Sequence, residues 1–203
     1  MRGGPVTADA GAGATSSTRP AGRVIRDFAA ASHLELEAGT RAGEFVLVLP
    51  GEHKLKTVCS LLVGERDLSI SAFVIRHPDE EELRVYRYLL SRNLRLPGLA
   101  YAIDGSGDVY VVGRVPLAAV DAAYLDRLLG VVLEATDGCF NELLALGFLS
   151  SMRKEWAWRT SRGESLRNLE PFRHLLEPVS LHEQPSSTRN EQVGPADGAT
   201  PDN

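Results

Sequence analysis

The sequence predicts an α+β domain built on an antiparallel sheet of about five to six strands, with helices on its flanks. Short apolar runs that end at turn residues fill the first half of the chain, and segments of helical periodicity enclose the last two runs. The connections between neighbouring runs are only a few residues long, whereas a parallel return needs roughly a dozen. We therefore expect antiparallel pairing and the order α-β-β-β-β-α-β-β-α.

The chain has 203 residues, 43% of them hydrophobic, which is enough for one well-buried domain with tails. Small and polar residues dominate both ends, and such segments bury too little apolar surface to fold. We divide the chain into a disordered N-terminal tail (1–21), the α+β domain (22–149), a C-terminal arm rich in Trp and Arg (150–177), and a disordered C-terminal tail (178–203).

The elements of the first half follow from periodicity and turn chemistry. Apolar side chains at helical spacing predict a helix over 23–32, which leads through His33 into a short alternating run. Strands are expected at 44–49, 55–63 and 68–75, since each run is β-branched or apolar and ends at Pro, Gly or charged turn residues.

Four consecutive acidic residues predict the start of the second helix. Asp79 is expected to open it, with Glu80, Glu81 and Glu82 in the first turn, where carboxylates meet unpaired N–H groups and the positive end of the helix dipole. The amphipathic pattern that follows ends near Asn93.

The second half predicts a hairpin and a long helix. Strands at 99–103 and 109–115 are joined by a short Asp- and Gly-rich turn. Helical spacing then continues over 117–146 to a glycine stop at Gly147. A straight helix of this length would run roughly 42 Å. Such a helix either bends near Gly138 or carries one end past its own domain, and we favour the bend because Gly138 adjoins a weak helix former.

Several segments resemble the YbjN-like family of bacterial sensory transduction regulators. They are FVLVLPG at 45–51, RLPGLAYAIDGSGDVYVVGRVPL at 95–117, LDRLLGVVLEATDGCFNELLALGF at 125–148, and the KEWAWR, SRG and NLEPF motifs of the arm. The resemblance covers about residues 22–175. It implies a fold like that of type III secretion chaperones, supplies no catalytic residues, and by fold analogy suggests a homodimer.

The same resemblance suggests one partner. Relatives in GC-rich bacteria can lie beside genes of mycothiol biosynthesis, so it implies an enzyme of that pathway as a partner candidate.

Charge and cysteine content favour a cytoplasmic protein. The net charge of −5 argues against the basic surface of a nucleic-acid binder. Cys59 and Cys139 lie in apolar runs without metal-type spacing, which indicates reduced core thiols and a reducing compartment. No signal peptide or run of roughly 18 apolar residues is present, so we expect no membrane contact.

No motif predicts a catalytic, metal or cofactor site. Asp104, Ser106 and Asp108 match the first oxygen ligands of a calcium loop, but Val115 occupies the position of the closing glutamate. We therefore expect an acidic turn there. The histidines lack ligand spacing, and no glycine-rich loop opens a helix. A non-enzymatic role without a cofactor follows by elimination.

The C-terminal arm carries the candidate protein-binding residues, because Trp and Arg dominate binding hot spots. They are Arg153, Trp156, Trp158, Arg159, Arg162, Arg167 and Phe172. Three interpretations stay open: the two indoles cover the domain's own sheet, dock on a partner or a second copy, or stack on nucleic-acid bases. Six basic residues against three acidic ones would give only weak, salt-labile nucleic-acid binding, so no nucleic-acid partner is expected.

The favoured function is a non-enzymatic cytosolic regulator or chaperone-like adaptor that binds a protein partner of unknown identity. The alternative is a small-molecule sensor or an unrecognised enzyme. Its cleft would lie between the sheet and the long helix and be lined by Tyr86, Tyr101, Tyr110 and Tyr124.

Overall fold

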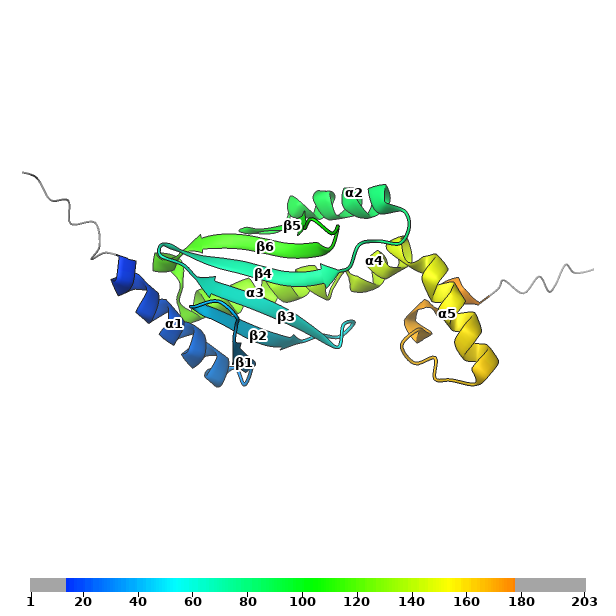
Figure 1. Ribbon diagram of the computed structural model, residues 1–203, viewed down its shortest axis with the longest axis horizontal. Helices are drawn as coiled ribbons and strands as arrows, with labels where there is room; N and C mark the ends of the chain where they lie inside the picture. The colour runs from blue at the N-terminus through cyan, green and yellow to red at the C-terminus, as the bar shows by residue number, and fades with distance from the viewer. Residues whose placement is uncertain (1–13, 178–203) are drawn as a thin grey trace, which may run out of the picture.

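The structure, a computed structural model, describes residues 14–177 (Figure 1). The parts of the predicted tails at 1–13 and 178–203 lie outside the described residues. The elements in chain order are α1 (Ala14–Ala31), β1 (Glu35–Ala38), β2 (Glu44–Pro50), β3 (Lys56–Val63), β4 (Asp67–Ile75), α2 (Glu82–Asn93), β5 (Leu99–Ile103), β6 (Val109–Pro116), α3 (Ala122–Thr136), α4 (Phe140–Gly147), α5 (Leu149–Arg162) and α6 (Arg173–Leu176). Short 3-10 turns occur at Leu117–Ala119 and Glu170–Phe172.

The predicted α+β fold class and the order of the elements are confirmed. The six strands form one sheet in the order β1-β2-β3-β4-β6-β5, and every neighbouring pair is antiparallel. Short turns join the strands of each consecutive pair, as the antiparallel geometry requires.

One face of the sheet carries the hydrophobic core. Alternate residues of the strands point to this face, where α1 and α3 cover them, and Figure 1 shows α3 behind the sheet. The fully buried side chains include Ile25, Leu47, Cys59, Leu61, Leu68, Val74, Val109, Val111, Leu125 and Val132. Both cysteines are buried and free, as expected of core thiols.

The predicted long helix is interrupted at the expected place. Residues 117–119 form a 3-10 turn, α3 ends at Thr136, and α4 begins at Phe140. A Cβ at Gly138 would lie 2.8 Å from the Glu134 carbonyl oxygen, so the backbone comes too close there for a side chain. Glycine therefore permits the bend.

Two predicted helix starts were wrong. α2 begins at Glu82, not at Asp79, and follows Glu81, which has a left-handed backbone (φ 52°). The reason is long-range, because Asp79 and Glu80 bind the start of α5 instead. α1 begins at Ala14, so residues 14–21, assigned to the tail from sequence, are helical. Burial of Ala21 and Ile25 stabilises the helix at this point. Extending an existing helix toward its N-terminus then costs little free energy, because each added residue gains a backbone hydrogen bond.

Candidate protein-binding surfaces

The C-terminal arm forms a small helical unit with its own core. Trp156 is 8% exposed and packs with Phe172, Met152 and Leu169 in a cluster separate from the main core. Trp158 is 48% exposed, because two positions along a helix turn a side chain by about 200°. The expected pair of indoles therefore points in different directions, and neither lies on the sheet.

Some arginines of the arm form contacts within it, and others are exposed to solvent. Arg159 forms an ion pair with Glu155 at 2.7 Å and donates a hydrogen bond to the Ser165 carbonyl oxygen, which fixes the turn after α5. Arg153 donates to the Leu175 carbonyl oxygen at 3.3 Å. The guanidinium of Arg162 lies 4.9 Å from the centre of the exposed Trp158 ring, and Arg167 is also exposed.

Two carboxylates attach the arm to the domain. The Ser150 backbone N–H and hydroxyl both donate to Glu80 at 2.6 Å, and the Ser151 hydroxyl donates to Asp79 at 2.7 Å. Arg76 also binds Asp79 in a bidentate pair. Hydrogen bonds from Arg76 and Ser151 lower the pKa of Asp79, and hydrogen bonds from Ser150 lower that of Glu80. Both acids thus stay charged at neutral pH.

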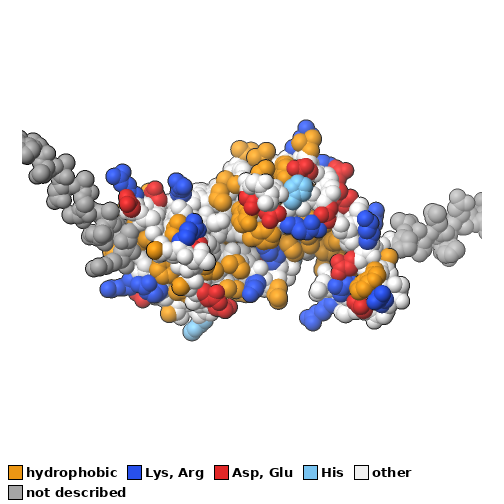
Figure 2. All heavy atoms as spheres, viewed as in Figure 1, with side chains coloured by type: hydrophobic (Ala, Val, Ile, Leu, Met, Phe, Trp, Pro, Cys, Tyr) orange, Lys and Arg blue, Asp and Glu red, His pale blue; other side chains and the backbone are white. Residues whose placement is uncertain are grey.

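The second face of the sheet is open. Among residues 14–177, α1 and α3 pack on the core face and no helix packs over the middle of the opposite face, whose side chains are half-buried or exposed. Cross-strand register places an apolar row on this face, which we call the apolar row: Val48, Val58, Phe73, Tyr110 and Ala102. Phe73 and Tyr110 meet edge to face, with ring centroids 5.5 Å apart. Figure 2 views this face, and apolar side chains gather over its β4–β6 half.

A shallow depression lined by serines lies beside the apolar row. Ser60, Ser69 and Ser71 line a shallow depression on the same face, with Arg41 and Arg114 at its rim. Arg41 pairs with Glu44 at 2.8 Å, and the hydrogen bonds from Arg41 and Ser60 lower the pKa of Glu44 to about 2. The row next to the apolar row is therefore mixed, with Ser60 and Ser71 at its centre and Val46, Val112 and Ala100 on either side.

A second apolar surface lies on α2. Leu83, Leu90 and Leu94 follow one stripe of the helix, and Leu94 is 90% exposed. Strand β5 lies alongside at the edge of the sheet, where the Asn93 side-chain oxygen accepts a hydrogen bond from the Tyr101 backbone N–H at 2.7 Å. This contact occupies a backbone donor that an added strand would need, so the edge at Tyr101 is closed to strand addition.

The α3–α4 junction is held by polar contacts that the sequence analysis did not identify. The Asp137 carboxylate is buried and accepts hydrogen bonds from the backbone N–H groups of Glu52, His53 and Lys54 at 2.6–3.0 Å. The hydroxyls of Thr57 and Thr136 lie 3.1 Å apart in the core. The segment ATDGC (135–139) is thus the joint between the helices and the β2–β3 turn.

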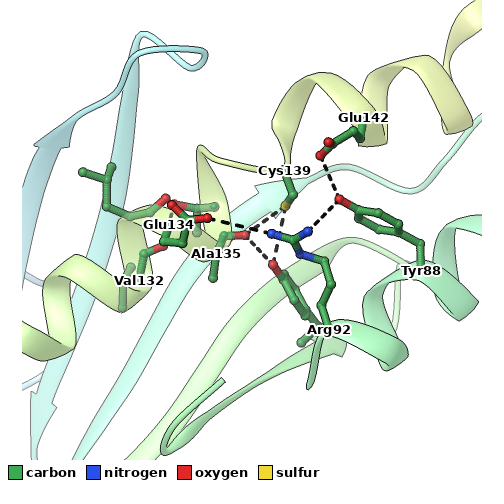
Figure 3. Close-up of polar contacts among 10 residues, drawn as sticks. Tyr88, Arg92, Val132, Glu134, Ala135, Cys139 and Glu142 are labelled. Atoms are coloured by element: carbon green, nitrogen blue, oxygen red, sulfur yellow. Dashed lines mark hydrogen bonds and ion pairs between the residues drawn. The ribbon is translucent and has the colours of Figure 1, made fainter. Parts of the chain in front are cut away.

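A network on the other side of this joint ties it to α2 (Figure 3). The Tyr101 hydroxyl donates to the Ala135 carbonyl oxygen at 2.7 Å, and the Cys139 thiol donates to the same oxygen at 3.1 Å. Tyr88 donates to Glu142 at 2.8 Å, while Arg92 donates to the Tyr88 hydroxyl at 3.1 Å. Burial raises the pKa of the Cys139 thiol, so these contacts hold a protonated cysteine.

The four tyrosines proposed to line one cleft are separated. Tyr86 and Tyr101 line a small pocket between α2 and β5, Tyr124 lines a groove beside α3, and Tyr110 lies on the open face. The predicted shared cleft was wrong, because Tyr101 pairs with Val111 across β5 and β6, so the neighbouring Tyr110 points to the opposite face of the sheet.

The acidic turn at 104–108 serves as a hairpin connection. Asp104 accepts hydrogen bonds from the backbone N–H groups of Ser106 and Asp108, and Asp108 accepts one from the backbone N–H of His77. Within residues 14–177 no group of three or more His, Cys, Asp or Glu side chains could hold a metal ion. No helix in the same range is long and apolar enough to cross a membrane.

These features define an open-faced α+β domain with a helical C-terminal arm and solvent-facing apolar surfaces on its sheet and on α2. Residues 23–145 match the model of the YbjN family, described as "Putative bacterial sensory transduction regulator". The chain belongs to this family.

Relatives occur in mycobacteria. The chain is 50% identical over 165 residues to "Uncharacterized protein Rv0487" of Mycobacterium tuberculosis, a match that spans 79% of this chain and 90% of the relative. It is 51% identical over 158 residues to "Uncharacterized protein ML2442" of Mycobacterium leprae, spanning 76% and 86%.

Solved structures with some likeness include two complexes. The ExsC–ExsE complex contains a chain with a TM-score of 0.48 and 20% identity, over 62% of this chain and 95% of that one. The HopA1–SchA chaperone–effector complex contains one with a TM-score of 0.47 and 17% identity, over 62% and 96%.

Proposed function

We propose that the protein is a non-enzymatic cytoplasmic regulator, or chaperone-like adaptor, that binds a protein partner on the open face of its sheet. The observation that carries this proposal is the apolar row, which crosses five strands and which no helix within residues 14–177 covers. Contiguous exposed apolar surface of this kind marks interaction sites on soluble proteins. Membership in a family of regulators supports the same role.

The experiment is capture of partners by the immobilised full chain. Val58→Glu places a charge in the apolar row at an exposed position, and we expect it to abolish the capture of specific partners. Glu37→Lys is the matched control, because Glu37 lies on β1 at the margin of the same face. An enzyme of mycothiol biosynthesis is the first purified partner to test. Equal capture by wild type and Val58→Glu would contradict the proposal.

The exposed residues of the arm extend the proposed binding surface. Trp158, Arg162 and Arg167 face solvent, whereas Trp156, Arg159 and Phe172 hold the arm together, and Arg153 binds across it to the Leu175 carbonyl oxygen. The three exposed side chains combine an aromatic ring with cations, as hot spots do. We expect Trp158→Ala to weaken partner capture without loss of stability.

A homodimer is also part of the proposal, and the leucine stripe of α2 supports it. The helix is acidic at its start and basic at its end, so two antiparallel copies would oppose unlike charges. With Leu83 of one copy beside Leu94 of the other, Glu82 would lie beside Arg95.

A small-molecule sensor is the second candidate. The pocket between α2 and β5 is apolar and lined by Tyr86, Leu90, Tyr101 and Ile103, but its volume is only about 230 Å³. Typical ligand pockets hold roughly 300–1,000 Å³. A thermal-shift screen against nucleotides, thiols and sugar phosphates tests this candidate, since a ligand at a hundred times its Kd adds about 2.7 kcal/mol. A shift lost in Ile103→Asp, which changes the pocket and leaves the leucine stripe of α2 intact, would favour it.

A further inference from the structure

A groove separates the C-terminal arm from the end of the sheet. Its volume is about 410 Å³, and its walls come from β4, α4 and the start of α5. The lining is mainly apolar and includes Phe73, Phe140, Phe148 and Met152. Phe73 also belongs to the apolar row, so the row runs directly into the groove.

Lys54 places a cation in this apolar lining. The Lys54 ammonium donates hydrogen bonds to the Phe73 and Val74 carbonyl oxygens at 2.8 and 3.0 Å. It also lies 5.2 Å from the ring centre of Phe73 and 5.6 Å from that of Phe140. The Asp137 carboxylate accepts a hydrogen bond from the Lys54 backbone N–H. The Lys54 side chain is therefore held at its backbone end by Asp137 and at its ammonium end by the two carbonyl oxygens.

The Lys54 charge lacks a carboxylate partner within the groove. An ammonium group has three N–H donors, and the two carbonyl oxygens use two of them. Among residues 14–177, no carboxylate oxygen lies within 4.0 Å of its Nζ atom. Burial lowers the pKa of Lys54 and outweighs the attraction of the Asp137 carboxylate, which acts in the opposite direction.

The other charges of the groove are neutralised. Arg76 pairs with Asp79 at 2.6 Å, and its guanidinium stacks 4.7 Å from the centre of the Phe148 ring. Glu155 pairs with Arg159 at 2.7 Å. The charge that remains for a bound molecule is therefore positive and surrounded by aromatic and aliphatic side chains.

We propose that the groove binds an extended segment of a partner protein that carries a large apolar side chain next to an Asp or Glu. The apolar side chain would fill the space between Phe148 and Met152, and the carboxylate would accept the third N–H of Lys54. This inference rests on the proposed protein-binding function and specifies the chemistry of the bound segment. A carboxylate fits because a charge-assisted hydrogen bond in an apolar site is stronger than one in water.

The test is selection of random twelve-residue peptides on the immobilised full chain. We expect the enriched peptides to share an Asp or Glu within two positions of Phe, Leu, Met or Trp. Binding of a labelled selected peptide is then measured by fluorescence anisotropy. Changing its acid to the amide should weaken binding to the wild type roughly tenfold, a comparison that needs no protein variant.

Protein variants locate the contact. Lys54→Met keeps the apolar stem and removes the charge, so on this variant the acid and amide peptides should bind within about twofold of each other. Lys56→Met, which removes the exposed lysine two positions along, should keep the wild-type difference. An equal acid-to-amide effect on wild type and Lys54→Met would overturn the inference.

The remaining outcomes separate the two proposals. Suppose that selected peptides bind Lys54→Met and Phe73→Ala as well as they bind wild type but do not bind Val58→Glu. This result would overturn the proposal of a binding groove and would leave the proposed binding function of the open face intact. No enriched peptide, together with no partner capture, would overturn both. If the selected peptide converts a dimer into monomers in sedimentation velocity, a second copy is the occupant of the groove and the partner-segment inference fails.

Discussion

At the scale of single residues, Asp137 has a larger role than its place at a helix end predicts. Its carboxylate fixes three consecutive backbone N–H groups of the β2–β3 turn, 83 to 85 positions earlier in the chain. Burial raises the pKa of Asp137, but the hydrogen bonds from Lys54, Glu52 and His53 outweigh it and leave the pKa below its ordinary 3.8. The charged form is therefore the one that the fold selects.

We expect Asp137→Asn to lower the free energy of unfolding by about 2 kcal/mol, since the amide offers one acceptor and turns an NH₂ group toward the remaining donors. A depressed folded pKa stabilises the fold above the unfolded pKa and loses that effect as pH falls through the folded value. Urea unfolding should show a constant gap between wild type and variant from pH 5 to pH 7. The difference in unfolding free energy between wild type and variant should become smaller below about pH 4. A difference that stays the same at low pH would show that the charged Asp137 carboxylate does not stabilise the fold.

The Tyr101 hydroxyl provides a second test at this scale. It is buried and donates to the Ala135 carbonyl oxygen at 2.7 Å, on the last full turn of α3. Tyr101→Phe should cost about 1–2 kcal/mol of unfolding free energy, because a core carbonyl loses its main donor. Tyr110→Phe on the open face is the matched control and should cost less than about 0.5 kcal/mol. Equal costs for the two substitutions would show that the hydroxyl contact is not stabilising.

At the scale of elements, the contacts of Asp79 and Glu80 explain why α5 starts where it does. Its first backbone N–H groups need acceptors, and Glu80 supplies one from a loop 70 positions earlier. The backbone N–H groups of Asp79 and Glu80 in turn donate to the Gly147 carbonyl oxygen at the end of α4. This loop therefore joins both helices to the end of β4.

Removal of these carboxylates should loosen the arm while the sheet stays intact. We expect Asp79→Ala combined with Glu80→Ala to raise the hydrogen-exchange rate of residues 149–162 about tenfold or more and to leave β3 and β4 unchanged. Glu81→Ala is the control, because the one ion pair of Glu81 within residues 14–177 is with Arg84 in the adjoining first turn of α2. Protection that is lost equally in the sheet and in α5 would argue against a local attachment.

The elements that could be predicted from sequence are those determined by local pattern. The strands 44–49, 55–63 and 68–75, the hairpin and the bend near Gly138 all follow from alternation, turn residues and helix-weak positions. The start of α2 could not be predicted this way, since the acids that resemble its first turn have partners in α5. The contacts of Asp137 and Lys54 depend on chain segments that meet only in the fold.

At the scale of the whole molecule, the candidate surfaces share one origin. A two-layer domain covers only one face of its sheet, so the other face stays available. The sequence indicated a binding protein and located its surface in the arm, where Trp and Arg are dense. The apolar row was not predicted, because alternation identifies two faces of a strand without showing which one a helix covers.

Self-association through α2 is the prediction that concerns the molecule as a whole. A stripe of exposed leucines with unlike charges at its two ends suits a two-fold pair of helices. We expect sedimentation velocity to report a dimer for the wild type and a monomer for Leu90→Arg, because residue 90 of one copy would lie beside Arg87 of the other and two like charges would meet at each of two places. Val58→Glu is the control and should remain dimeric. A monomeric wild type at micromolar concentration, or a dimeric Leu90→Arg, would show that α2 does not join two copies.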